Sequence, residues 1–249
     1  MYTNINYNHY IQMETLDSLF DVITHELCVE TARLLQNEQE KLQQITWSSG
    51  ESNLDTEYSS LACSCCTNAW NTIKEKHVNY TNVNISCSIP DINIMFTFPD
   101  GSHISKKIEL KSSKNIKMPG STIKKLDINQ PLIYCLRPQK ENGGYKIRYS
   151  QYYNAIGETN FDLFQDRTPR PFINFDKMND IETNNTSFQY KEKDAWIQHY
   201  ADCAIYRINN PCQYSWQDDL VKVIKKKIIE DYLKNNTIEQ IKEYKSRYK

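Results

Sequence analysis

The sequence lacks the features that mark several large classes of protein. No apolar run approaches the roughly 18 residues of a membrane-spanning helix. Residues 1–20 contain no basic stretch followed by an apolar one, which a secretory signal would require. No Gly-x-x-x-x-Gly-Lys-Ser/Thr loop is present, so no ATP-binding P-loop is expected. These absences lead us to expect an intracellular, cytoplasmic protein that has no helicase or ATP-binding loop of its own.

Cysteine is too sparse to build a disulfide scaffold, with eight residues in a chain of 249. Cys63 and Cys66 form one Cys-x-x-Cys pair, but no second pair follows it, and Cys87 is a lone further candidate. A structural zinc site would need two such pairs. We therefore expect reduced, partly buried thiols in a reducing compartment rather than zinc ligands.

Charge of one sign is not in excess overall, because the net charge is −1. The chain thus has no global basic signature for nucleic acid. Its distribution is uneven, however: residues 103–125 contain seven lysines and one acid, Glu109. A charge run is commonly a solvated face. A single carboxylate within it also fits a phosphate-facing surface that holds a metal ion.

The apolar pattern predicts a single domain over residues 1–249, with helices and strands mixed along the chain. Helical spacing is found over 14–44, 61–77, 194–207 and 216–233, with a basic tail that continues to about 245. Strands are predicted over 91–98, 104–111, 131–138 and 144–153. This order predicts an α/β or α+β fold with a mixed central sheet flanked by helices.

Glu30 falls on the apolar stripe of the first predicted helix, between Leu27 and Leu34. Burying a carboxylate without a partner is costly. Glu30 therefore forms a salt bridge, lies at the water-facing edge of the stripe, or points into an active site. Glu26 lies one turn earlier, near the edge of the same stripe, and is the weaker candidate.

A hairpin is predicted around residues 98–103, Phe-Pro-Asp-Gly-Ser-His, which has the composition of a tight turn. The chain reverses near Asp100, so Asp100 is a turn residue, whereas Asp91 lies on the strand that precedes the turn. Two registers place Asp91 opposite either Glu109 or Leu110. Only the first puts the two carboxylates on one face, and the sequence leaves the register open.

Glu109 and Lys111 lie two residues apart on the second strand of this hairpin, so their side chains project to the same side. Leu110, between them, is expected to point into the core. Carboxylate oxygens are suitable ligands for Mg²⁺. A lysine beside them can neutralise phosphate charge and orient an attacking water. The pattern therefore suits metal-dependent hydrolysis of a phosphodiester.

Pro90-Asp91, a spacer and Glu109-Leu110-Lys111 together resemble the motif of the PD-(D/E)xK nuclease superfamily. That superfamily includes type II restriction endonucleases, Holliday junction resolvases and repair nucleases. The motif covers about 22 residues of this chain, and the order helix, hairpin, strand, helix around it is compatible with the family. The resemblance implies a restriction-endonuclease-like fold.

The resemblance also implies roles for individual residues. Asp91 and Glu109 would ligate Mg²⁺, and the carbonyl of Leu110 would be a further ligand. Lys111 would orient or activate the attacking water. Many members carry a carboxylate on the preceding helix that reaches the metal, and Glu30 is the first choice for it here.

The implied function is a Mg²⁺-dependent endonuclease that cuts double-stranded DNA at a specific sequence, as a homodimer. Residues expected to contact DNA follow the catalytic strand or lie in a later loop, and they are Ser112, Ser113, Lys114, Asn115, Lys117, Arg167 and Arg170. Three alternatives stay open: a structure-specific repair or recombination nuclease, a non-catalytic DNA-binding protein, and an unrelated protein whose hairpin carboxylates have no chemical role.

Overall fold

The computed structural model describes most of the chain, in segments. These are residues 4–47, 56–77, 82–88, 91–121, 127–140, 143–156, 172–182, 188–192 and 215–247, with scattered positions between 195 and 209. The chain divides into two compact units, residues 1–157 with 165–198 and residues 158–164 with 199–249.

The N-terminal helices differ from the predicted ones mainly at their ends. The predicted helix 14–44 is two helices, α1 (Asn4–Asn37) and α2 (Gln39–Gln44), which are separated at Glu38. The Glu38 N–H donates to the Leu35 carbonyl at 3.1 Å, so the last turn of α1 tightens before the chain restarts. The predicted helix 61–77 begins earlier, as α3 (Thr56–Ile73), and ends in the 3₁₀ turn η1 (Lys74–His77).

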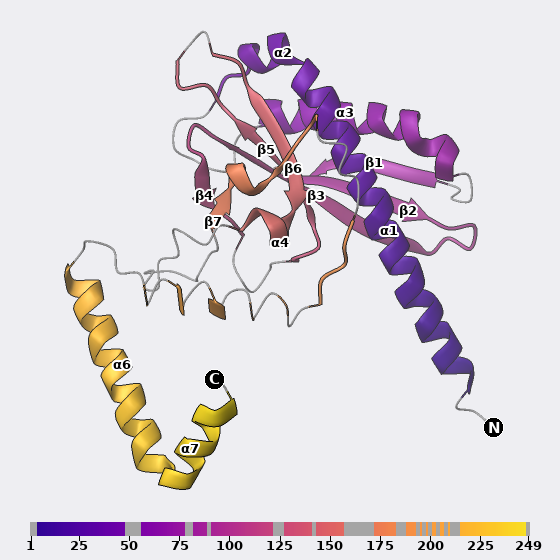
Figure 1. The fold of residues 1–249 in the computed structure, drawn as a ribbon. Helices are drawn as coiled ribbons and strands as arrows, with labels where there is room; N and C mark the ends of the chain where they lie inside the picture. The colour runs from indigo at the N-terminus through magenta and orange to yellow at the C-terminus, as the bar shows by residue number, and fades with distance from the viewer. Residues whose placement is uncertain are drawn as a thin grey trace. The chain divides into compact units, whose positions relative to one another are not determined.

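A six-stranded mixed sheet forms the centre of the first unit (Figure 1), in the order β1-β2-β3-β5-β6-β8. Only β3 and β5 pair in parallel, and the other neighbours are antiparallel. The strands are β1 (Asn82–Ser88), β2 (Asp91–Thr97), β3 (His103–Ser113), β5 (Pro131–Leu136), β6 (Lys146–Gln151) and β8 (Asn179–Asp180). The predicted mixed sheet is therefore confirmed, and β1 and β8 are additions to it.

One face of this sheet packs against α1 and α3 to form the main core. Ile92, Ile94 and Phe96 alternate along β2 as fully buried side chains, which is the period of two that a half-buried strand shows. Phe20 of α1 packs on Phe96 with ring centroids 4.6 Å apart. Figure 1 shows α1 running across the strands. Each such side chain contributes about 1.5–3 kcal/mol when fully buried, so this face fixes the position of α1 on the sheet.

The opposite face has its own, smaller cover. β4 (Lys117–Pro119) pairs with β7 (Phe172–Asn174), and the chain continues through η3 (Phe175–Lys177); α4 (Tyr152–Ala155) follows β6. Tyr134 of β5 meets Phe175 edge to face at 5.4 Å. Because Lys111 is paired in parallel with Tyr134, both side chains lie on this face. The small sheet thus covers the β5–β6 side of the face that carries Lys111.

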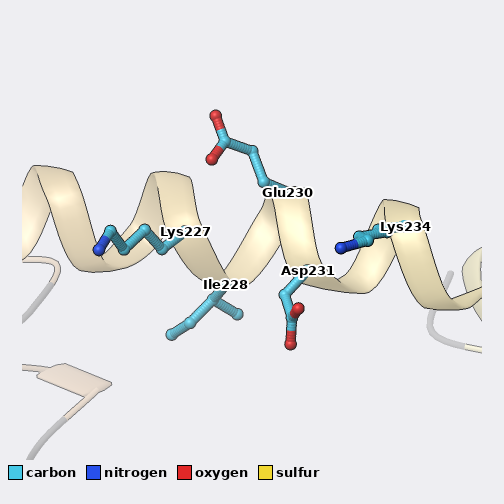
Figure 2. A pocket seen from close by; sticks show the side chains of 5 residues that line it. All are labelled: Lys227, Ile228, Glu230, Asp231 and Lys234. Carbon is cyan, nitrogen blue, oxygen red and sulfur yellow. The ribbon is translucent and has the colours of Figure 1, made fainter.

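The second unit contains α6 (Ser215–Asn235) and α7 (Ile238–Arg247), which cover the predicted helix 216–233 and its basic tail. The predicted helix 194–207 falls on residues of which only scattered positions are described. A hollow on α6 is lined by Lys227, Ile228, Glu230, Asp231 and Lys234. These described lining residues all lie on one helix and project in different directions (Figure 2), so they form no converging group of side chains. Across the described segments, no helix combines the length and apolar character that crossing a membrane demands.

Candidate active site

A tight turn sets the geometry of the β2–β3 hairpin. The Phe98 N–H donates to the Ser102 carbonyl at 2.9 Å. Gly101 has a φ of 84°, a left-handed conformation that favours glycine. The Asp100 carboxylate accepts hydrogen bonds from the Ser102 N–H and hydroxyl at 2.9 and 2.6 Å. These two bonds, the hydroxyl's first, hold the pKa of Asp100 below its usual value. Asp100 therefore stabilises the turn, as expected.

The register of the hairpin runs from the Thr97–His103 pair next to the turn to the Ile92–Ile108 pair. One residue further along each strand, Asp91 comes opposite Glu109. Since residues directly opposite in an antiparallel pair share a face, both carboxylates lie on one face of the sheet. Of the two registers that the sequence left open, the structure has the one that brings the carboxylates together.

Glu109 is held in a defined position by two neighbours. Its side chain is buried, with the residue only 4% exposed. Its Oε1 accepts a hydrogen bond from the Ser121 hydroxyl at 2.8 Å and lies 2.6 Å from the Lys111 Nζ. The Ser121 N–H donates in turn to the Tyr152 hydroxyl, which fixes the backbone of Ser121. Glu109 and Lys111 thus form a partly buried ion pair, as their spacing on one strand predicts.

Asp91 carries an unsatisfied acceptor. Its Oδ1 is buried with no hydrogen-bond partner, while the Leu110 N–H donates to the same carboxyl group. Burial is the larger cause that raises the pKa of Asp91, and the Glu109 carboxylate is the next; Lys111 partly opposes them. The Leu110 side chain is buried in the core as expected, whereas a ligand role for its carbonyl stays a prediction.

These groups open onto a cavity of about 610 Å³. The cavity lies where β3 has not yet met β5, because the parallel pairing of the two strands begins at Glu109 and Leu132. Its lining comes from α1, β2, β3 and the segments before β5, and includes Asp21, Thr24, Asp91, Ser105, Lys106, Lys107, Glu109, Ser121, Asp127, Gln130 and Pro131. Carboxylates and lysines therefore line one open space.

The structure does not bring Glu30 to this cavity. Its carboxylate is paired with Arg33 through two contacts of 2.5 and 2.9 Å, and Glu26 lies 2.9 Å from His77 Nε2. Of the alternatives weighed for Glu30, the one observed is a salt bridge at the edge of the buried face. In this structure Glu30 therefore does not reach the candidate metal site, which differs from the role that the resemblance implied.

The carboxylate that α1 does place at the cavity is Asp21, whose Oδ1 lies 2.7 Å from Lys106 Nζ. Asp21 and Glu30 are nine residues apart, which is about 2.5 turns at 3.6 residues per turn, so they project from opposite sides of the helix. The sequence stripe misled because Thr24, Cys28 and other small or polar residues are also buried, and they turn the buried face toward Asp21. If the small residues of α1 are included in the predicted buried face, that face turns toward Asp21, and Asp21 becomes the candidate carboxylate.

The donor set at the cavity fits a hard divalent cation. Among the residues that the structure describes, no three His, Cys, Asp or Glu side chains are close enough to form a metal cluster. Mg²⁺ needs less, since it is commonly held by one or two carboxylates and keeps several waters. The unpartnered Oδ1 of Asp91, next to Glu109, is what such a cation would satisfy. Elsewhere, Cys63 is hydrogen-bonded to Cys87, and burial, the first cause, raises the Cys63 pKa to about 12, which disfavours the thiolate that zinc requires.

The predicted DNA-contacting residues divide by location. Ser112 and Ser113 end β3 and are half-buried, as is Lys117 at the start of β4. Lys114 and Asn115 are exposed at the tip between these strands. The remaining two, Arg167 and Arg170, lie outside the described residues.

Comparisons of the chain with protein-family models, curated proteins and solved structures return no match. They therefore neither support nor oppose the resemblance carried by residues 90–111. The site itself therefore carries the information on function.

Proposed function

We propose that this protein is a Mg²⁺-dependent deoxyribonuclease of the PD-(D/E)xK type, with a restriction-endonuclease-like fold, which hydrolyses double-stranded DNA at a specific sequence. The observation that carries the proposal is the pairing of Asp91 with Glu109 across the hairpin, with Lys111 on the same face. In a hairpin with only a structural role, a half-buried Asp91 beside the buried Glu109, with its Oδ1 left without a partner, would only cost stability.

In this proposal Asp91 and Glu109 would hold the metal. Bound there, Mg²⁺ would supply charge neutralisation at the scissile phosphate and a water of lowered pKa. The Ser121 hydroxyl fixes which way the Glu109 carboxylate faces, since it donates to Oε1. Such support determines whether a ligand is held in productive geometry.

Lys111 would act on the substrate. Its Nζ lies 2.6 Å from Oε1 of Glu109, which lines the cavity, and from there it would donate to a phosphate oxygen or orient the attacking water. Lys106 and Lys107 line the same cavity and would add positive potential along the DNA backbone. Asp21 lies 2.7 Å from Lys106 and would limit how far that lysine moves.

A two-fold homodimer is part of the proposal, because restriction enzymes that cut both strands of a palindrome usually work as two-fold dimers. A structure-specific repair or recombination nuclease would use the same residues and differ in what it selects. The two functions can therefore be distinguished by which DNA the protein cuts, and not by the residues that line the cavity.

The proposal is tested by incubating the purified protein with plasmid and phage DNA in Mg²⁺, and in parallel with EDTA. We expect discrete fragments that appear only with Mg²⁺. A smear would indicate a nonspecific nuclease, and cleavage confined to branched or nicked DNA would indicate a structure-specific one. Absence of metal-dependent cleavage on every DNA tried would refute the nuclease.

A further inference from the structure

The backbone at the end of β3 is anchored in an unusual way. We define the tip as residues 114–116, between β3 and β4. Its three successive carbonyls all accept hydrogen bonds from the body of the protein: the first from Gln139 Nε2, the second from the Tyr134 hydroxyl at 2.5 Å, and the third from the Phe175 N–H at 2.8 Å. The peptide groups are thereby fixed before any ligand binds.

While the carbonyls of the tip are bonded to the protein, its side chains are exposed to solvent. Lys114 and Asn115 are exposed, and the apolar Ile116 is 45% exposed. Within residues 103–121, all of which the structure describes, Ile116 is the only large apolar side chain exposed to this degree. The Asn115 N–H also donates to the Ser113 hydroxyl at 3.0 Å, so the backbone leading into the tip is restrained as well.

The tip is anchored to the face that carries the candidate catalytic residues. Its middle carbonyl is bound by Tyr134, which shares a face with Lys111 through their parallel pairing. Lys114 directly follows the end of β3 and lies five residues beyond Glu109, which is roughly 16 Å at about 3.3 Å per residue of strand. On B-form DNA this corresponds to about five base-pair steps of 3.4 Å. Such a distance is suitable for a group that reads bases beside the cleavage point.

We infer that the tip reads an A·T base pair in the major groove of the substrate, an inference that rests on the proposed nuclease function. Asn115 would make the bidentate contact with adenine N6 and N7 that its amide geometry allows. Ile116 would pack on the thymine methyl group, which is the one apolar feature of the groove. Lys114 would bind a neighbouring phosphate and hold the tip in register.

The chemistry of the three side chains favours A·T over G·C. Guanine is read most often by the bidentate fork of arginine, and the tip has none. A tip that only tracked phosphates would make no use of Ile116, whereas an apolar side chain next to Asn115 matches the thymine methyl group of an A·T pair. The inward carbonyls reduce the ordering cost of binding, because the backbone loses little further freedom.

The test uses the full-length protein and begins by mapping its Mg²⁺-dependent cut sites on phage DNA. We expect an A·T pair at a constant position near each cut. Synthetic duplexes then carry uracil for that thymine, or 7-deazaadenine for that adenine. Loss of the methyl group should slow cleavage about fourfold, and loss of adenine N7 about tenfold or more.

Variants assign these effects to the tip. Asn115→Ala should lower the preference for the A·T pair about 10-fold to 100-fold and abolish the response to 7-deazaadenine. Ile116→Ala should abolish the response to uracil. The matched control is Asn68→Ala, an exposed asparagine on α3, the helix that packs on the other face of the sheet. It should leave both responses unchanged.

The outcomes separate this inference from the proposed function. Discrete cleavage whose sites contain no constant A·T pair, or whose preference survives Asn115→Ala, would overturn the inference and leave the nuclease standing. Nonspecific cleavage would do the same. No metal-dependent cleavage at all would refute the nuclease, and with it the reading of DNA by the tip.

Discussion

Replacing Asp91 by asparagine is expected to stabilise the metal-free protein. The change removes a like charge opposite Glu109, where such a pair costs about 0.2–1 kcal/mol. It also removes the charge from a half-buried carboxyl group whose buried Oδ1 has no partner, and an unsatisfied buried polar atom costs about 1–3 kcal/mol. Because the amide must itself be accommodated, a net gain of about 1–2 kcal/mol is reasonable. For a protein of this size that corresponds to a rise in Tm of roughly 2–8 °C.

The sign of the pH dependence follows from the raised pKa of Asp91. The folded state holds this proton more tightly than the unfolded state, so the ionised group destabilises the fold at neutral pH. That penalty disappears as the pH falls through the folded pKa toward the unfolded value of about 3.9. The gain from Asp91→Asn should therefore be full at about pH 8 and small near pH 4.

Thermal melts in EDTA measure this gain, and melts in millimolar Mg²⁺ test its origin. The metal should stabilise the wild type and not Asp91→Asn, so the gap between them should narrow. Asp100→Asn is the matched control, and it should lower Tm or leave it unchanged, because the ionised Asp100 is stabilised by Ser102. The reasoning is refuted if Asp91→Asn lowers Tm in EDTA, or if Mg²⁺ raises the Tm of the wild type and of Asp91→Asn by the same amount.

Three further predictions concern other residues. His25 is buried, both its ring nitrogens lack hydrogen-bond partners, and its pKa is lowered chiefly by burial. The free energy of unfolding should therefore fall as the pH drops through about 6.5, the pKa of the unfolded state. Thermal melts of His25→Phe should show a weaker dependence of Tm on pH, and an unchanged dependence would contradict this. Ser121→Ala removes the hydrogen bond to Glu109 and should raise the Mg²⁺ concentration for half-maximal cleavage about 10-fold to 100-fold; an unaltered requirement would show that the hydroxyl does not support the ligand. Asp21→Asn should slow cleavage while Glu30→Gln does not, and equal rates for the two variants would refute the placement of Asp21 at the site.

The hairpin was accessible to sequence reasoning because its determinants are local. The turn composition around Asp100 fixed the reversal, and alternation along β2 fixed the buried face. The register was not accessible, since a shift by one residue changes no local preference. It became visible only from the pairing of Ile92 with Ile108 across the strands.

The elements that were missed depend on contacts distant in sequence. β1 is rich in asparagine and serine and was not predicted, yet it pairs along its whole length with β2. β4 was not among the predicted strands, and it exists because Met118 pairs with Ile173, 55 positions later. Asp21 was overlooked because burial of small residues on α1, rather than the leucine pattern, decides which side of that helix faces the sheet.

The central claim is tested most directly by the rate of Mg²⁺-dependent cleavage of plasmid DNA by Asp91→Asn and Asp100→Asn, measured side by side. The two variants make the same chemical change at the two Pro-Asp pairs of one hairpin. If Asp91 holds the metal and Asp100 holds the turn, Asp91→Asn loses cleavage while its fold is retained, and Asp100→Asn cuts at nearly the wild-type rate. Equal rates for the two variants, or full activity in Asp91→Asn, would contradict the account.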